Sequence, residues 1–302
     1  ATEEALGDVA DVVHVMDREG DAYETFHLLH QRDWSYVIRL AQIRNAIEPA
    51  TGEQTKIDEA LQRAAVRTER TVQISERIDD GRTLHQRRAF PARSARRARL
   101  SIRACSVHLC RPVNRDDQDD LDDRIPVNLV EVVELEPPEG EEPVRWMLIT
   151  SEPIETVEQV LQVVDLYRSR WVIEEYFKAI KTGCAYRKRQ LDSIVTLLNA
   201  LAITLPIAWR LLALRHLERE APQAPAGKVV SRAQLLLLQR AAKKCKWSRT
   251  PTLSEVLTAV ARLGGHIKSN GRPGWQVLGR GWSRLMTLEA GYQMALELQE
   301  AG

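Results

Sequence analysis

Five residues with chemically active side chains recur at helical spacing in one short stretch of the chain. They are Tyr167, Arg170, Glu174, Lys178 and Lys181, within YRSRWVIEEYFKAIK. At about 100° per residue they share a helix face about 80° wide, and that face lacks the aliphatic side chains of a core-facing helix. Cleavage of a phosphodiester uses such a set, because a carboxylate can hold a divalent metal while Arg and Lys contact the phosphates. An exposed helix that carries several i,i+4 ion pairs has the same pattern. The residues alone do not decide between a phosphodiester-cleaving site and such a solvated helix.

A second candidate carboxylate follows an apolar run near the start of the chain. The run VVHVM predicts a buried strand that ends at Asp17. The carboxyl end of a central strand is where α/β sheets place their chemistry. Asp also caps turns and helices often, and on the residues alone that ordinary role is the favoured interpretation.

Further strands must position these groups. WSYVIRL predicts a strand with Arg39 near its end, and VRWMLIT predicts one that begins beside Trp146. Apolar and polar residues alternate from Ala98 to Leu109 and again in VNLVEVVELE, as in half-exposed strands. From about residue 215 the pattern becomes helical, with a loop at APQAPAG and an apolar stretch, RAQLLLLQRAA.

The charge of the chain is balanced overall but uneven along its length. The 302 residues include 43 Lys and Arg against 42 Asp and Glu, a net charge of +1. Nine Arg and no acid lie between Arg82 and Arg111, and six Asp fall between Asp116 and Asp123. The Arg-rich segment is the type of patch that contacts phosphates, although charged runs are more often simply solvated. The acidic segment either shields that patch or solvates a turn.

Other classes of site find little support in the sequence. The four Cys have neither zinc-site nor disulfide spacing, and the seven His are scattered. No glycine-rich phosphate loop or Gly-x-Ser-x-Gly motif is present. We find no leader peptide and expect no membrane-spanning run, so a reducing cytoplasm is the expected location.

The segment DLYRSRWVIEEYFKAIKTG resembles the signature of the DDE transposases of bacterial insertion sequences, the Tn-five (IS-four) group. In that Y-R-E-K signature, Tyr, Arg, Glu and Lys stand at the spacing of Tyr167, Arg170, Glu174 and Lys181. This spacing favours Glu174 over its neighbour Glu175 as a metal ligand. DREGD, which begins at Asp17, is similar to the family's DRExD segment with its second catalytic Asp. The block AVARLGGHIKSNGRPGWQVLGRGWSRL resembles the family's terminal block, in which glycines form turns and Trp275 and Trp282 pack helices.

The resemblance implies a role for each site residue. Asp17 and Glu174 are the implied catalytic carboxylates and ligands of Mg²⁺, for which Mn²⁺ can substitute. The implied DNA and phosphate contacts are Arg39, Tyr167, Arg170, Lys178 and Lys181. Trp146 and Trp171 match positions where an aromatic ring stacks on an extruded base, although on the residues alone Trp146 is a core residue.

The implied fold is an α/β RNase H-like catalytic core, incomplete at the N-terminus, with a β-rich insertion and an all-helical C-terminal region. The expected divisions are residues 1–45 and 146–215 for the core, 46–145 for the insertion and 216–302 for a dimerisation region. The implied partners are double-stranded DNA, at transposon ends and target, and a second copy of the chain in a synaptic dimer. The implied location is the bacterial cytoplasm, in association with the nucleoid.

The family uses three carboxylates, and the first should lie on a strand upstream of Asp17. Asp8 and Asp11 fall in an expected helical segment and do not match that position. The expectation is therefore a fragment of a cut-and-paste transposase that cleaves through a DNA hairpin. The alternative is an inactive truncated form that dimerises with the full-length enzyme and inhibits it. An RNase H-like nuclease unrelated to transposition explains less of the sequence.

Overall fold

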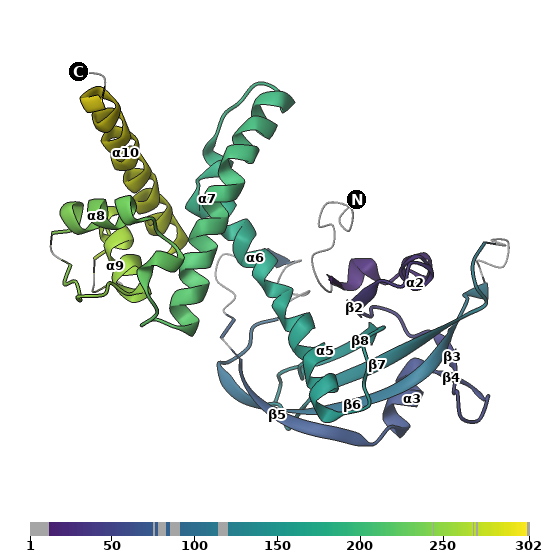
Figure 1. Cartoon of the computed structure of the whole chain (residues 1–302). Coiled ribbons are helices and arrows are strands. Elements are labelled where there is room, and N and C mark those ends of the chain that lie inside the picture. Colours follow the sequence, from purple (N-terminus) through teal and green to yellow (C-terminus); the bar gives the residue numbers. More distant parts are fainter. Residues whose placement is uncertain are drawn as a thin grey trace. The chain divides into compact units, whose positions relative to one another are not determined.

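The computed structural model describes residues 12–74, 76–77, 83–84, 91–113, 120–243, 245–267, 269 and 271–300. The chain divides into two compact units, Ala1–Arg170 and Trp171–Gly302, which we describe separately (Figure 1). The helical segment expected around Asp8 and Asp11 lies outside the described residues.

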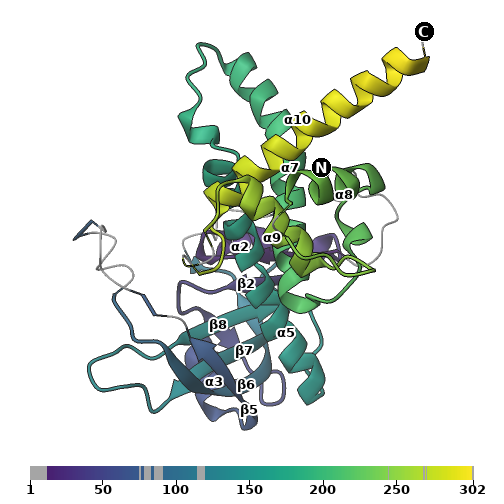
Figure 2. The same ribbon diagram turned by 90° about the vertical axis from the view of Figure 1, so that its left-hand side faces the viewer.

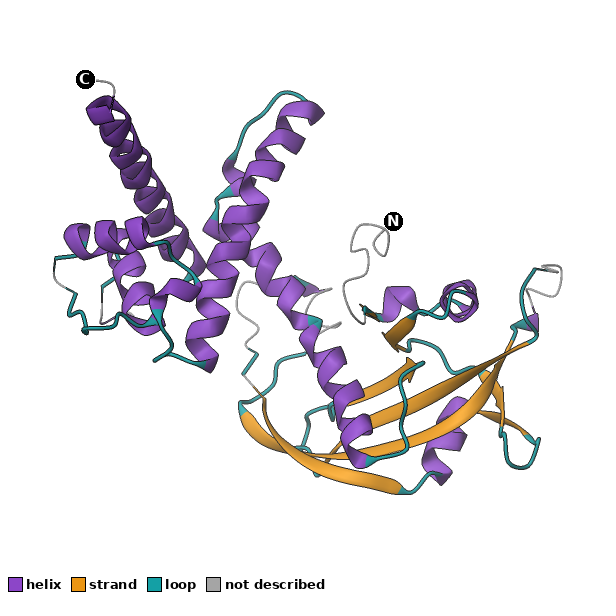
Figure 3. Cartoon of the chain, viewed as in Figure 1, coloured by secondary structure: helices purple, strands orange, loops and turns teal. Residues whose placement is uncertain are grey.

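The first unit is built on a mixed eight-stranded sheet (Figure 3). Its strands are β1 (Val13–Met16), β2 (Ser35–Arg39), β3 (Asn45–Ile47), β4 (Gln54–Lys56), β5 (Val66–Ile74), β6 (Arg96–Cys110), β7 (Arg124–Leu135) and β8 (Arg145–Thr150). They run in the order β1-β2-β8-β7-β6-β3-β4, and β5 also pairs with β6. β1 and β2 are parallel, and the other pairs are antiparallel.

Apolar side chains cover both faces of this sheet, because successive residues of a strand point to opposite sides. Ile38 and Leu129 pack in one cluster with residues of α2 (Tyr23–Gln31) and α3 (Ile57–Arg63). Their neighbours Val37 and Val130 pack in another cluster with the buried stripe of α5 (Val157–Ser169). The sheet is therefore a central layer between helices, which fits the α/β class expected from the sequence.

The strands of the expected insertion, residues 46–145, take part in the same sheet as β1, β2 and β8. The long strands β6 and β7 pair with each other, and β7 pairs with β8, which in turn pairs with β2. The two compact units meet in sequence at Arg170 and Trp171, and the expected divisions at residues 45, 145 and 215 stay predictions. Continuous backbone hydrogen bonding across the sheet joins the insertion strands to β1, β2 and β8.

The second unit is helical and has its own core. Its helical segments are α6 (Trp171–Lys178), the π-helical turn η3 (Ala179–Gly183), the 3₁₀ turns η4 (Tyr186–Lys188) and η5 (Ala226–Lys228), α7 (Ile194–Glu220), α8 (Arg232–Ala241), α9 (Leu253–Leu263) and α10 (Trp275–Glu300). The first part of α10 is buried through Trp275, Trp282 and Leu285, and its second part extends beyond α8 and α9 (Figure 2).

Two of the glycines expected to form turns instead allow helices to touch. Gly265 and Gly271 do have positive φ angles. Gly279 and Gly281, however, lie within α10, where a Cβ on Gly281 would sit 1.8 Å from the carbonyl oxygen of Val260 in α9. Trp275 and Trp282 are buried in the core of this unit.

One helix, α7, is long and apolar enough to cross a membrane by length and composition alone. Its best window has a mean hydropathy of 1.8, and 28% of that window is buried. The sequence was expected to contain no membrane-spanning run, and by length and composition α7 departs from that expectation. A single helix of this kind is weak evidence for a membrane span, since core helices of globular proteins pass the same test.

Candidate functional site

Asp17 stands directly after β1, as the sequence predicts, at the N-cap of a 3₁₀ turn (Arg18–Gly20). Its Oδ1 accepts a hydrogen bond of 3.0 Å from the Glu19 amide, so the ordinary capping role is present. Its Oδ2 lies 3.5 Å from Nη1 of Arg170, and the side chain is 45% exposed. The carboxylate is therefore partly open to solvent and has a cation from the other end of the unit's sequence beside it.

The parallel pairing of β1 and β2 explains the position of Arg39. Met16 pairs with Ile38, so Asp17 and Arg39 lie at the carboxyl ends of adjacent parallel strands. Such edges are where α/β sheets place ligand contacts. The Arg39 guanidinium donates to the backbone carbonyl of Arg145 at 3.1 Å. Arg39 thus has a structural partner near the edge where Asp17 lies.

Asp21, only four residues after Asp17, has a role that the sequence analysis missed. Its side chain is fully buried and accepts hydrogen bonds from the amides of Ala41 and Gln42 at 2.6 and 2.9 Å. The Arg44 guanidinium adds a bidentate pair to Oδ1, through Nε at 2.9 Å and Nη2 at 2.6 Å. Asp21 therefore ties the segment after β2 to the turn that carries Asp17. The acidic cluster DREGD was the available signal, but it did not separate a buried Asp from an exposed one.

Tyr167 and Trp146 pack against each other. Their ring centroids are 5.4 Å apart with an interplanar angle of 65°, an edge-to-face arrangement. Tyr167 is 7% exposed on the buried stripe of α5, and Trp146 is half-buried against the same core cluster. The two rings contribute to packing between β8 and α5, which is the core role that the residues alone suggested for Trp146.

The segment Tyr167–Lys181 is not one regular α-helix. α5 ends at Ser169, and Arg170 has helical backbone angles but donates its amide to Tyr167 at i−3. α6 then runs to Lys178, and the π-helical turn η3 follows and carries Lys181. A π turn is wider than an α turn, so the single 100° wheel does not extend to Lys181. Tyr167 and Arg170 belong to the first unit, and Glu174, Lys178 and Lys181 to the second.

On α6, the exposed ring of Trp171 and a local ion pair surround Lys178. The Lys178 ammonium lies 2.8 Å from Glu175 and 5.2 Å from the Trp171 ring centroid. Burial by itself would raise the pKa of Glu175, but Lys178, Arg215 and Arg219 together hold the pKa below its usual value. Glu175 is therefore engaged inside the second unit, and the choice of Glu174 as the ligand stays a prediction from the spacing of the signature.

Lys181 is placed by backbone contact between η3 and α10. A Cβ on Gly279 would lie 1.7 Å from the carbonyl oxygen of Gly183, so the backbones of η3 and α10 touch at a point where no side chain fits. Ala179, Ile180 and Gly183 are buried, whereas Lys181 is exposed, with its ammonium 5.3 Å from the Phe177 ring centroid. The turn thus buries one side against α10 and presents Lys181 to solvent.

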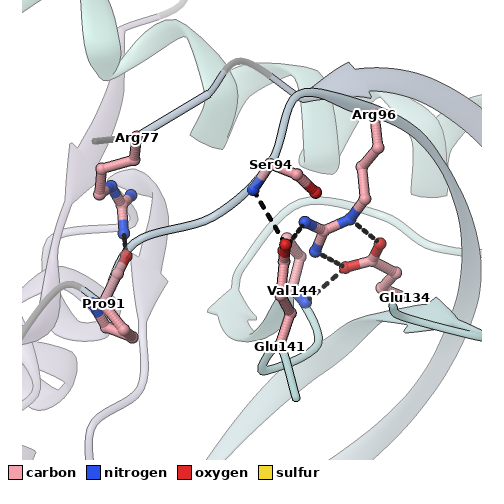
Figure 4. Close-up of polar contacts among 7 residues, drawn as sticks. All are labelled: Arg77, Pro91, Ser94, Arg96, Glu134, Glu141 and Val144. Carbon is pink, nitrogen blue, oxygen red and sulfur yellow. Dashed lines mark hydrogen bonds and ion pairs between the residues drawn. The ribbon is translucent and has the colours of Figure 1, made fainter. Parts of the chain in front are cut away.

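Three arginines of the Arg-rich segment, Arg96, Arg99 and Arg111, have carboxylate neighbours. Arg96 forms a bidentate pair with the buried Glu134, at 2.6 and 2.9 Å, and a further ion pair with Glu141 (Figure 4). Val144 also donates its amide to Glu134, and Ser94 donates to Glu141. The Arg96 hydrogen bond is the main cause that holds the pKa of Glu134 below its usual value.

Arg99 and Arg111 have acidic neighbours as well. Arg99 lies 3.5 Å from Glu69 and 3.6 Å from Glu136. Arg111 lies 2.6 Å from Asp123, at the end of the acidic segment. The acidic segment therefore pairs with the Arg-rich one at this point, while Arg82, Arg87, Arg88, Asp116, Asp117 and Asp119 lie outside the described residues. The phosphate patch expected from the count of arginines is weakened by these internal pairs.

The donor chemistry of the two candidate carboxylates suits a hard cation such as Mg²⁺ or Mn²⁺, which prefers oxygen ligands. Oδ2 of Asp17 lies 3.5 Å from the Arg170 guanidinium. Within the described ranges, no group of three or more His, Cys, Asp or Glu is gathered in a geometry that could hold a metal. Asp17 belongs to the first unit and Glu174 to the second. Each unit therefore carries one of the two candidate carboxylates.

A comparison with protein families identifies the chain. The model of the family described as Transposase DDE domain matches residues 6–206. The match covers most of the chain. It includes Asp17, the parallel strands β1 and β2, and the segment from Tyr167 to Lys181. The chain therefore belongs to the Transposase DDE domain family, whose members act on DNA and generally use a divalent metal.

Proposed function

We propose that the chain is a DDE transposase of the Tn-five (IS-four) group that cuts and rejoins DNA at transposon ends through a hairpin. The observation that carries this proposal is the ion pair between Asp17 and Arg170. It brings Asp17, at the end of β1, together with Arg170 of the signature, and these two residues lie near opposite ends of the first unit in sequence. An RNase H-like arrangement of the sheet around β1 and β2 is part of the proposal.

In this proposal Asp17 and Glu174 hold the divalent metal, Mg²⁺ or Mn²⁺. The metal supplies Lewis-acid stabilisation of charge on the phosphoryl oxygens. Arg170 and Lys181 contact phosphates on either side of the cleaved bond and stabilise developing negative charge. The remaining residues of the proposed phosphate contact are Arg39, Tyr167 and Lys178. In the structure Arg39 donates to the carbonyl of Arg145, Tyr167 packs against Trp146, and Lys178 pairs with Glu175.

The two tryptophans have different claims to base stacking. Trp171 is 58% exposed, so its ring face is accessible to an unstacked base in the way that DNA-hairpin formation requires. Trp146 is half-buried against Tyr167 and is the weaker candidate. We therefore assign the stacking role first to Trp171.

The proposed partners are double-stranded DNA and a second copy of the chain. The distal part of α10 supports pairing of two copies, because it exposes Met286, Leu288, Tyr292, Met294 and Leu298. Apolar side chains on an otherwise solvated helix are typical of a helix that packs against a partner. The proposed location is the bacterial cytoplasm, with the protein bound to the nucleoid.

The direct test is Mg²⁺-dependent nicking of supercoiled plasmid carrying the matching transposon ends. We expect Asp17→Asn and Glu174→Gln each to lower the nicking rate by at least about 100-fold, as removal of catalytic groups does. Glu175→Gln is the matched control on the adjacent position, and we expect it to nick within a few-fold of the unchanged chain. Nicking that survives both Asp17→Asn and Glu174→Gln would exclude this metal site.

A further inference from the structure

The helical second unit contains a cavity of about 420 Å³ that the signature motifs do not explain. It lies between the last turns of α7, the face of α9 and the segment from Gly271 to Pro273. Four of its lining residues are arginines: Arg215, Arg219, Arg262 and Arg272. The family match ends at residue 206, before all four.

The charge on the walls of this cavity is strongly one-sided. Four guanidinium groups face a lining that contains one carboxylate, Glu218. Ser254 and Thr258 add hydroxyl groups from α9. Burial and then the charge of Arg219 lower the pKa of Arg215; Glu175 and Glu218 act against this shift, and Arg272 adds to it. Like charges have thus converged at a cost that a bound anion would offset.

Arg215 shows the cost most clearly. Its guanidinium carbon lies 4.5 Å from the ring centroid of Trp275, which fixes the plane of the group. Its Nη1 is buried and has no hydrogen-bond partner in the structure as described. A buried charged donor without an acceptor is costly and rare, so an acceptor is expected to occupy the cavity when the protein is at work.

Carboxylates of the chain neutralise some of its arginines, but within its described part they do not pair with two of the arginines that line this cavity. Arg96 in the first unit has two Glu partners (Figure 4). Among the described residues, by contrast, no hydrogen bond or ion pair engages the guanidinium of Arg219 or of Arg272. Arg219 and Arg272 are exposed and thus available to a ligand, and the buried Nη1 of Arg215 is the donor here that lacks an acceptor among the described residues.

We propose that this cavity binds a phosphate group, and that the group belongs to the DNA backbone. A phosphate presents several strong acceptors to planar guanidinium forks, and Arg matches this geometry better than Lys. The volume far exceeds the roughly 30 Å³ of one water molecule, so a sugar beside the phosphate also has room. The choice of DNA as the source rests on the proposed function; the phosphate site does not.

The DNA arm of the test uses the full chain and a short fluorescent duplex in anisotropy titrations at several KCl concentrations. Each phosphate contact contributes about 0.9 to the slope of log K against log [salt]. We expect Arg219→Gln with Arg272→Gln to weaken binding several-fold and to reduce the slope by about one to two. Arg280→Gln removes the same charge from an exposed position on α10 outside the cavity, and we expect it to leave the slope unchanged.

The second arm uses inorganic phosphate and does not depend on DNA. At constant ionic strength, we expect phosphate to raise the unfolding temperature of the unchanged chain and of Arg280→Gln more than chloride does, but not that of the double variant. If only this arm responds, the cavity takes a free phosphate and the DNA source is overturned. If the unchanged chain binds no DNA yet responds to phosphate, the proposed function fails and the site stands. If the double variant matches Arg280→Gln in both arms, the site itself is overturned.

Discussion

At the scale of single residues, the chain uses carboxylates of the same type in opposite ways. Asp17 is 45% exposed and caps a turn with one oxygen, whereas the Asp21 side chain is fully buried and saturated by hydrogen bonds. A buried, paired carboxylate stabilises the fold, and an exposed one can bind a ligand. The two roles can be told apart only from the positions of Arg44 and of the backbone amides after β2. The short sequence DREGD does not reveal those positions.

We expect Asp21→Asn to destabilise the first unit by about 3–5 kcal/mol, since it leaves the Arg44 charge buried without its partner. Asp165→Asn is the matched control, because Asp165 likewise accepts from arginine, in its case Arg70 and Arg168, but is 49% exposed. Its loss should cost about 1 kcal/mol or less. Urea unfolding measures both, and equal losses for the two variants would contradict the structural role of Asp21.

The Glu134 carboxylate makes stability depend on pH. Its folded pKa lies below that of the unfolded chain, chiefly because of the Arg96 hydrogen bond. The resulting stability is fully present above the unfolded value of about 4.3 and is lost as the pH falls through the folded pKa. We expect the unfolding free energies of the unchanged chain and Glu134→Gln to differ at pH 7 and to converge in acid. A difference that stays constant from pH 7 to the acid range would show that Glu134 does not carry this linkage.

The pairing of the Arg-rich segment also marks a limit at this scale. Counting charges along the sequence gave a phosphate patch, but Arg96 and Arg99 meet acids from β5, β7 and the turn after β7. These partners come from residues about 30 or more positions away. Only the strand pairing reveals them, so a count of nearby residues overestimates the free positive charge.

At the scale of elements, apolar runs predicted β1, β2 and β8, and alternation of apolar and polar residues predicted β6 and β7, whereas the short strands β3 and β4 and the strand β5 were not predicted individually. β1, β2, β6, β7 and β8 lie where the sequence placed them, because each is a strand with a clear apolar pattern. The π turn after Lys178 was not predictable in that way. It depends on the contact between Gly183 and Gly279, which are far apart in the chain.

We expect Gly279→Ala to destabilise the second unit by about 1–3 kcal/mol or more, because the new methyl group meets the Gly183 carbonyl in a packed contact. Gly291→Ala is the control on the same helix, since a Cβ there meets nothing within 4 Å among the described residues. It should stabilise α10 by about 1 kcal/mol through helix propensity. Thermal unfolding separates the two effects.

The same substitution links packing to function. If η3 is displaced, Lys181 moves with it, so Gly279→Ala should also weaken DNA binding while Gly291→Ala does not. Unchanged stability in Gly279→Ala would mean that α10 and η3 do not pack as described. Unchanged DNA binding in a destabilised Gly279→Ala chain would instead argue against a DNA contact by Lys181.

At the scale of the whole molecule, the sequence predicted the α/β class of the fold and the transposase family. The expected insertion is continuous with the sheet, because hydrogen bonds between strands join residues that lie far apart in sequence. The observed division falls inside the signature itself, between Arg170 and Trp171. A helical pattern across that point gives no sign of a boundary, since Arg170 keeps helical backbone angles.

This division makes the joint action of Asp17 and Glu174 the central claim. In the proposed function each unit supplies one carboxylate, and the family match spans residues of both units. The most direct measurement is a titration of the full chain with Mn²⁺, in which electron paramagnetic resonance reports the concentration of the free ion. The variants Asp17→Asn and Glu174→Gln and the control Glu175→Gln are titrated in the same way. We expect either of the first two substitutions to abolish the same binding phase and the control to retain it. If the phase persists in Asp17→Asn or in Glu174→Gln, the two carboxylates do not share a metal, and the account of the site is wrong.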